Sequence, residues 1–283
     1  MHVGITLVFD GKPGRGMNDI AAAALRAQDA GIHSVWFPEH VVFVNDAKST
    51  YPYGTLRMGR QPGLFDPLIA LTVAAAATST IRLGTGVLIL PIREPLTLAQ
   101  QVVSLDHASH GRFDLGIGVG WLREEFEALS VPWEHRGERT DEYVEVLRKA
   151  WTDEVVTHHG VFVNITGVQA WPKPVQPGGP PILVGGNTPA AIRRTARLGD
   201  GWFGWQLSVA EVAECIGALG HECERIGRNV ADIDLKVGVV PTGRPADLRD
   251  YAQALSELGV GELVVVTAPT ASDRFDEIAA LGK

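Results

Sequence analysis

Short apolar runs alternate with amphipathic segments along the whole chain. The first run covers residues 3–9, and after it Ile20, Ala23, Ala24 and Ala27 recur at the spacing of one buried helical face. Further pairs of an apolar run and an amphipathic segment follow in the same order to the end of the chain. Because strands that alternate with helices are joined by crossovers and lie parallel, this pattern predicts an α/β fold.

Eight strands are predicted, each followed by a helix. They cover residues 3–9, 34–38, 81–90, 112–118, 181–184, 202–205, 235–240 and 262–267. Two helices have a clear start, where Asp66 and Thr188 stand as N-caps before Pro67 and Pro189. Eight such units match a closed (β/α)₈ TIM barrel better than an open doubly wound sheet. One barrel accounts for all 283 residues, so we predict a single domain over residues 1–283.

Two connections are longer than this rhythm requires. The stretch from Val41 to Leu64 follows the second strand, contains Tyr51, Tyr53 and Arg57, and is long enough to form a substrate lid. After the fourth strand and its helix, residues 158–176 have the pattern of a hairpin insertion with a proline-rich connector. We therefore expect insertion loops after strands 2 and 4.

Charge and composition exclude several classes of protein. The formal net charge is −8, whereas nucleic acids and anionic membranes bind basic surfaces. The sequence has neither a signal-peptide pattern at its start nor an apolar window of about 18 residues. We expect a cytoplasmic protein with no nucleic-acid or membrane partner. Metal-ligand spacings such as H-E-x-x-H or paired C-x-x-C do not occur, so no metal site is predicted.

The residues that directly follow each strand are the candidates for chemistry, because active sites of barrels lie at the carboxyl ends of the strands. Glu39 and His40 follow the second strand. An imidazole with a pKa of about 6.5 can donate or accept a proton at neutral pH, and Glu39 beside it is placed to tune or orient a nearby group. We predict catalytic roles for His40 and Glu39; the alternative is a structural histidine with satisfied hydrogen bonds.

The strongest local signal follows the fifth strand. Gly185, Gly186, Asn187 and Thr188 join the strand end to the start of a helix. Such a glycine turn exposes backbone N–H groups, and together with the helix dipole they favour an anion such as the phosphate of a mononucleotide. The alternative is an ordinary tight connection that Thr188 caps.

The fourth strand ends in alternating glycines. Gly116, Gly118 and Gly120 alternate with apolar residues before Trp121. Glycine lets a flat ring approach the backbone closely, so a planar cofactor would fit beside Gly118, Gly120 and Trp121. The alternative is small-residue packing inside a tapered barrel, and the sequence favours neither.

Taken together, these stretches resemble the luciferase-like monooxygenase superfamily over nearly the whole chain. The matching motifs include Glu39-His40, residues 81–87 with 93–95, residues 111–113 through 120–121, and residues 172–174 through 185–186. Within that superfamily the pattern is most similar to the deazaflavin-dependent branch that uses coenzyme F-420. Flavin mononucleotide (FMN) serves other branches.

The resemblance implies roles for individual residues. It places the cofactor phosphate at the turn 185–188, a non-prolyl cis peptide between Gly86 and Val87 against the cofactor ring, and His40 near the reactive carbon. Trp121 stands where the sugar-phosphate dehydrogenases of this branch have a polar residue, which argues against a sugar-phosphate substrate.

The implied activity is hydride transfer between coenzyme F-420 and a small organic substrate, with His40 as proton donor or acceptor. Two alternatives stay open at this point. One is an FMN-dependent monooxygenase that receives reduced flavin from a separate reductase, and the other is a barrel that binds a flavin without catalysis. Relatives are commonly dimers, so we also expect a homodimer.

Overall fold

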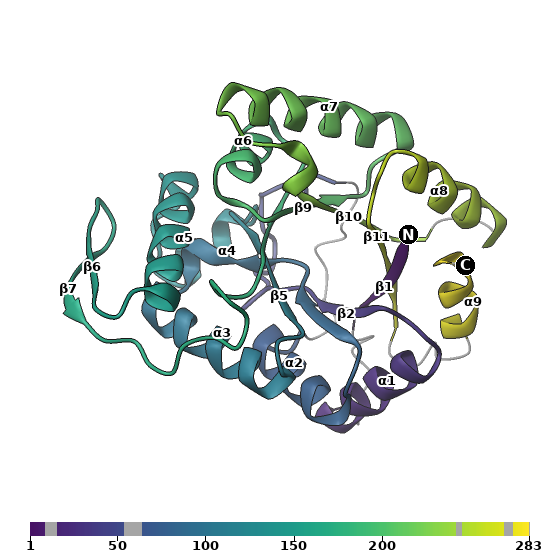
Figure 1. Ribbon diagram of the computed structural model, residues 1–283, viewed down its shortest axis with the longest axis horizontal. Coiled ribbons are helices and arrows are strands. Elements are labelled where there is room, and N and C mark those ends of the chain that lie inside the picture. The colour runs from purple at the N-terminus through teal and green to yellow at the C-terminus, as the bar shows by residue number, and fades with distance from the viewer. Residues whose placement is uncertain (9–15, 54–63, 242–244, 269–273, 283) are drawn as a thin grey trace.

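A computed structural model describes residues 1–8, 16–53, 64–241, 245–268 and 274–282. Within these ranges nine strands form one parallel sheet in the order β3-β2-β1-β11-β10-β9-β8-β5-β4, and β3 also pairs with β5. This last pairing closes the sheet into a barrel, and Figure 1 shows the helices arranged around it. β3 and β4 share one position, so the barrel has eight strands, and the TIM-barrel prediction is confirmed.

The barrel strands have the following bounds: β1 (His2–Leu7), β2 (Ser34–Phe37), β3 (Arg82–Thr85), β4 (Leu88–Ile89), β5 (Phe113–Gly118), β8 (Ile182–Gly185), β9 (Gly201–Trp205), β10 (Asp234–Val239) and β11 (Glu262–Thr267). The outer helices are α1 (Met17–Asp29), α2 (Pro67–Ala77), α3 (Pro95–Ser109), α5 (Arg136–Thr152), α6 (Pro189–Leu198), α7 (Val209–Arg225), α8 (Pro245–Glu257) and α9 (Phe275–Ala279). The short 3₁₀ helices within the described ranges are η1 (Leu90–Ile92), η2 (Val230–Asp232) and η4 (Ala280–Gly282).

Both predicted helix caps are present. The Asp66 carboxylate accepts a hydrogen bond from the backbone amide of Leu68 over 2.9 Å, directly after Pro67. The Thr188 hydroxyl accepts one from the amide of Ala191 over 3.2 Å. These caps satisfy amides that the first turn of a helix otherwise leaves without partners. They fix where α2 and α6 begin.

The third predicted strand differs from its prediction over residues 81–90. It is divided into β3 and β4 at the Gly86–Val87 bond, which is cis, as the resemblance implied. After β5 the chain forms a short helix that was not predicted, α4 (Arg123–Ala128).

The hairpin insertion predicted after strand 4 is present. β6 (Val156–His159) and β7 (Asn164–Val168) pair with each other in an antiparallel manner. In Figure 1 this hairpin projects from the barrel beside α5.

Side chains inside the barrel lie in layers, because alternate residues of a strand face opposite sides of a sheet. A middle layer is apolar and consists of Trp36, Leu183, Phe203 and Val264. Val87 and Trp205 are only partly buried and lie against this layer. They belong to the carboxyl-terminal end of the barrel, which we call the mouth.

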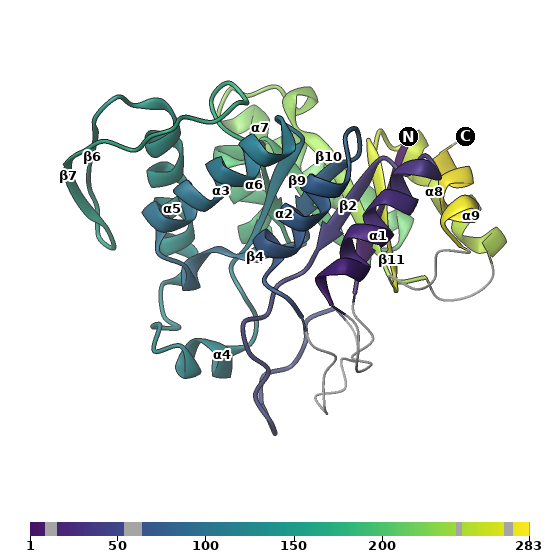
Figure 2. The same ribbon diagram turned by 90° about the horizontal axis from the view of Figure 1, so that it is seen from below.

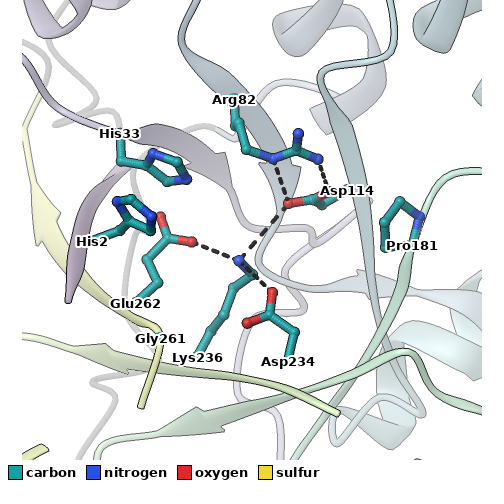
Figure 3. Close-up of a pocket in the computed structure, with 9 residues that line it drawn as sticks. All are labelled: His2, His33, Arg82, Asp114, Pro181, Asp234, Lys236, Gly261 and Glu262. Carbon is teal, nitrogen blue, oxygen red and sulfur yellow. Dashed lines mark hydrogen bonds and ion pairs between the residues drawn. The ribbon is translucent and has the colours of Figure 1, made fainter. Parts of the chain in front are cut away.

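The opposite, amino-terminal end is closed by charged side chains (Figure 3). Lys236 is 5% exposed, and its Nζ lies 2.7 Å from Glu262 and 2.8 Å from Asp234. Arg82 forms an ion pair with Asp114. Burial tends to lower the pKa of Lys236, but the surrounding carboxylates outweigh it and raise that pKa. These charged groups line a cavity of about 250 Å³. Because these charged groups pair with one another, we assign this end to stability of the fold, as is general for the amino-terminal end of such barrels.

Among the described residues, none of the helices is both long enough and apolar enough to cross a lipid bilayer.

Candidate active site

The predicted site residues gather at the mouth. β2, β5, β8 and β9 are parallel, so the segments that follow them emerge at the same end of the barrel. Figure 2 shows α4 and the loop after β2 on the side opposite the two chain termini. His40, Trp121 and the turn at Gly186 therefore belong to one end.

His40 has a partner at each ring nitrogen. Its Nδ1 lies 2.7 Å from a carboxylate oxygen of Glu125, and the indole Nε1–H of Trp121 donates to its Nε2 over 3.2 Å. The imidazole ring also contacts the ring of Phe43, at 4.6 Å between centroids. The side chain of His40 is 13% exposed, so it is held firmly but still reaches the mouth.

Glu125 was not among the predicted site residues. It lies in α4, is fully buried, and receives hydrogen bonds at Oε1 from the backbone amides of Val41 (2.7 Å) and Val42 (3.3 Å). One carboxylate thus fixes both the backbone after His40 and the imidazole itself. The available signals in the sequence were its position shortly after the fourth strand and the Glu125-Phe126 pair, which belongs to the motifs of the family resemblance.

Glu39 points to a different set of partners. Its carboxylate accepts a hydrogen bond from the backbone amide of Ile89 over 2.6 Å and forms an ion pair with Arg93, which also binds Asp66 at 2.7 Å. Burial raises the pKa of Glu39, although Arg93 partly offsets this effect. The contacts tie the end of β2 to β4 and to the start of α2. A catalytic role for Glu39 stays a prediction.

The glycine turn after β8 is tied to the end of β9. The side-chain amide of Asn187 donates to the Trp205 carbonyl over 2.8 Å, and its side-chain oxygen accepts from the Trp205 amide over 3.2 Å. Gly186 has a φ of +115°, a conformation that residues with a Cβ rarely adopt. Gly185, Gly186 and Asn187 are partly accessible, and Thr188 is exposed. The turn therefore faces solvent at the mouth.

Two tyrosines from the loop after β2 join this turn to His40. The Tyr53 hydroxyl lies beside this turn, 3.4 Å from where a Cβ on Gly186 would be, and the nearby backbone of Asn187 partly offsets the effect of burial, which raises the Tyr53 pKa. The Tyr51 ring contacts both the Tyr53 ring and the Trp121 ring, with centroids 5.6 and 5.2 Å apart. Trp121 in turn contacts His40, so a continuous chain of contacts runs from the turn to the imidazole. The third residue predicted in this loop, Arg57, lies outside the described residues.

Two of the glycines in residues 116–120, at the end of β5, leave room for neighbouring side chains. A Cβ on Gly118 would lie 2.8 Å from a methyl group of Val87, and a Cβ on Gly120 would lie 2.7 Å from the Phe126 ring. The small-residue packing alternative therefore describes these positions in this structure. Val87 is partly accessible and covers Gly118, so contact of this strand end with a planar ring would run through Val87. Cofactor binding by Gly118 and Gly120 stays a prediction.

Comparison with known proteins identifies the family. The sequence profile described as luciferase-like monooxygenase matches residues 1–262. The chain belongs to the luciferase-like monooxygenase family. An uncharacterised protein of Mycobacterium tuberculosis is 36% identical over 267 residues, which cover 93% of this chain and 91% of the relative.

Two further similarities concern cofactors of this family. An F-420-dependent glucose-6-phosphate dehydrogenase of Kineococcus radiotolerans is 29% identical over 92% of this chain and 73% of its own length. A type II Baeyer–Villiger monooxygenase of Pseudomonas putida, solved in complex with FMN, has a TM-score of 0.78 at 16% identity, with 99% of this chain and 97% of that chain covered. At such low identity the second similarity concerns the fold alone.

The luciferase-like barrel of this protein also contains a buried hydroxyl that has no hydrogen-bond partner among the described residues. Thr6 is 1% exposed, and its Oγ1 makes no hydrogen bond to any of the described residues. Residues of β1 with odd numbers join the outer core, and a Cβ on Gly4 would meet Trp36 and Glu262 inside the barrel. By strand alternation Thr6 faces the interior like Gly4, one step closer to the mouth. Sequence reasoning missed this residue.

These residues fit a bound mononucleotide-like cofactor in three respects. The turn at 185–188 brings a backbone amide at Asn187 next to the start of α6, with the Tyr53 hydroxyl beside the turn. The interior offers an unpartnered hydroxyl at Thr6. Between them lies the partly accessible surface of Val87 and Trp205. The family supplies the expectation of a flavin or deazaflavin, and the mouth has groups suited to both a phosphate and an apolar ring.

Proposed function

We propose that this protein binds coenzyme F-420 at the mouth of the barrel and transfers hydride between this cofactor and a small organic substrate. The observation that carries the proposal is the unbroken chain of contacts from the turn at Gly186 and Asn187, through Tyr51 and Trp121, to His40. A phosphate-binding turn and a titratable side chain at the same end are what a nucleotide-dependent oxidoreductase requires.

The residues of the chain divide this work. The amides at the start of α6 hold the phosphate, and the Tyr53 hydroxyl lies beside this turn. Val87 and Trp205 provide an apolar surface for the ring, and His40 exchanges a proton with the substrate at Nε2. When bound, the deazaflavin supplies a ring carbon that gives or accepts hydride.

The preference for coenzyme F-420 over FMN rests on similarity in sequence. The Kineococcus relative, whose name includes F-420, is similar over 92% of this chain at 29% identity, whereas the FMN-bound Pseudomonas protein shares the fold at 16% identity. The second candidate function is accordingly an FMN-dependent monooxygenase supplied by a separate reductase.

A titration distinguishes the two cofactors. Purified protein is titrated with coenzyme F-420 and, separately, with FMN, each oxidised and reduced, while absorbance is followed. We expect F-420 to bind more tightly by roughly tenfold or more, a difference of about 1.4 kcal/mol. Tighter binding of FMN would overturn the choice of cofactor.

The phosphate site has its own test in the Gly186→Ala variant. A Cβ there would lie 3.2 Å from the Cβ of Ala191 and 3.4 Å from the Tyr53 hydroxyl, in a backbone conformation that disfavours it. We expect this variant to lose affinity for either cofactor. Gly217→Ala is the matched control, because a Cβ at Gly217 in α7 meets open space. If Gly186→Ala binds as tightly as the parent, the phosphate lies elsewhere.

Catalysis is tested separately from binding. A screen of metabolite pools for bleaching of bound cofactor should identify a substrate, and His40→Ala should then keep cofactor affinity and lose turnover. Binding without turnover in every pool would favour the non-catalytic alternative. The homodimer stays a prediction that light scattering of the purified protein can test.

A further inference from the structure

His40 has a hydrogen-bonding neighbour on each of two opposite sides of its ring. On one side stands the Glu125 carboxylate, 2.7 Å from Nδ1, and on the other the Trp121 indole nitrogen, 3.2 Å from Nε2. A neutral imidazole has one donor and one acceptor nitrogen, and the partner at each nitrogen decides which is which.

The Glu125 side requires a donor at Nδ1. Oε1 of Glu125 already receives the backbone amides of Val41 and Val42, and an ionised carboxylate offers only acceptors. The remaining oxygen, Oε2, therefore accepts the Nδ1–H of His40. Because Glu125 is fully buried, no water competes for this oxygen.

The Trp121 side requires an acceptor at Nε2. An indole N–H can only donate, so the ring nitrogen that it reaches must offer a lone pair. The two contacts come from different residues and different parts of the ring, and both select the same tautomer.

We propose that Glu125 and Trp121 are positioning residues that hold His40 as the Nδ1-protonated tautomer, with the lone pair of Nε2 capped by the indole until a substrate replaces it. In the resting protein, Nε2 is then the basic nitrogen that faces the mouth, and the only ring proton is on Nδ1, which faces Glu125. A substrate proton that moves to Nε2 leaves an imidazolium whose charge is balanced by Glu125. The catalytic meaning of this arrangement rests on the proposed function, but the tautomer does not.

The test is a two-bond ¹H–¹⁵N NMR spectrum of the cofactor-free protein, assigned for His40 by comparison with His40→Ala. The ¹⁵N shifts distinguish a protonated from an unprotonated ring nitrogen directly. We expect the parent protein to show Nδ1 protonated and Nε2 bare. A parent spectrum with Nε2 protonated, or with both tautomers mixed, overturns the proposal without any variant.

Glu125→Gln sharpens the test by reversing one partner. Two backbone amides at Val41 and Val42 keep the glutamine oxygen on their side, so its NH₂ group faces Nδ1. Nδ1 must then accept, the proton moves to Nε2, and the bond from Trp121 is lost. We expect the tautomer to invert in this variant, and an unchanged tautomer contradicts the role given to Glu125.

Two further variants complete the design. Glu124→Gln is the matched control, because its carboxylate binds the backbone amides of Lys48 and Ser49 and no imidazole. The tautomer should stay as in the parent. Trp121→Phe keeps an aromatic ring beside Tyr51 and removes the indole N–H that caps Nε2. Nδ1 should therefore stay protonated while the Nε2 shift changes, and no change at Nε2 contradicts the capping role. Since none of these spectra needs a cofactor, failure of the proposed function leaves their outcome intact.

Discussion

The indole Nε1–H of Trp205 donates a hydrogen bond to the hydroxyl of Tyr51 over 2.7 Å. Trp205 is the last residue of β9, and Tyr51 lies in the loop after β2, so this bond joins the end of β9 to that loop across the mouth. Burial raises the pKa of Tyr51 to about 12, which keeps the hydroxyl protonated at any physiological pH. At neutral pH this bond therefore joins two uncharged side chains.

The first prediction concerns this hydrogen bond. Tyr51→Phe keeps the ring contacts with Trp121 and Tyr53 and removes only the hydroxyl, a loss of about 1 kcal/mol in loop positioning. We expect cofactor affinity to fall by roughly fivefold, measured by the same absorbance titration. Tyr251→Phe is the control, because its hydroxyl donates to the Leu207 carbonyl outside the chain of aromatic contacts. An equal loss in both variants would show that the effect is not specific to the mouth.

The second prediction concerns stability in mild acid. His33 lies at the amino-terminal end, stacked on His2 at 3.9 Å between ring centroids. Burial lowers the pKa of His33, and Lys236, Arg82 and His2 lower it further against the opposing effect of Glu262. A lowered folded-state pKa means that protonation favours the unfolded chain. The stabilising contribution is complete above the unfolded pKa of about 6.5 and is lost as the pH falls through the folded value.

Thermal unfolding between pH 7 and pH 5 measures this effect. We expect the melting temperature of the parent protein to fall over this range by more than that of His33→Asn, because the variant has no imidazole to protonate. Identical pH dependence of the two proteins would assign the loss of stability to other groups.

The regular elements were predictable because their signals are local. The cap at Asp66 and the cap at Thr188 each lie within three residues of the amide they satisfy, and α6 begins where the sequence pattern placed it. The break between β3 and β4 had no signal in hydrophobicity, because the apolar run continues across Gly86 through residues 87–90, and only the family resemblance indicated the cis bond.

The arrangement of the mouth was only partly predictable for a physical reason. His40 and Glu125 are 85 residues apart in the chain, and their contact exists because barrel closure brings the ends of β2 and β5 together. The residue type at 125 did not reveal which side chain it would meet. Similarly, Gly118 was correctly placed at a strand end, but its neighbour Val87 became visible only in three dimensions.

The third prediction concerns the charged end of the barrel. Lys236→Met removes the cation that faces Glu262, and Glu262 is 1% exposed. An uncompensated buried charge of this kind costs about 3 to 5 kcal/mol, so we expect the free energy of unfolding in urea to fall by that amount. The double variant Lys236→Met with Glu262→Gln should recover part of the loss. Cofactor affinity of the folded variants should be unchanged, since the apolar layer around Trp36 separates this end from the mouth.

The fourth prediction uses the unpartnered hydroxyl of Thr6, and its two expected effects have opposite signs. Thr6→Val replaces the hydroxyl by a methyl group of similar size. Since a buried unsatisfied polar group costs about 1 to 3 kcal/mol, the variant should unfold at a higher urea concentration than the parent. If Thr6 binds a cofactor or substrate group inside the barrel, affinity should fall at the same time.

Thr267→Val separates these two effects. The hydroxyl of Thr267 is also buried and makes no hydrogen bond to the described residues. Thr267, however, lies on the same face of β11 as Leu263 and Val265 of the outer core, so it faces the helices. We expect this variant to gain stability and keep its affinity for the cofactor. Removal of a hydroxyl that binds a ligand lowers the affinity for that ligand, whereas removal of a hydroxyl without such a role leaves the affinity unchanged. Equal affinity of the Thr6 and Thr267 variants would therefore exclude Thr6 from the binding site.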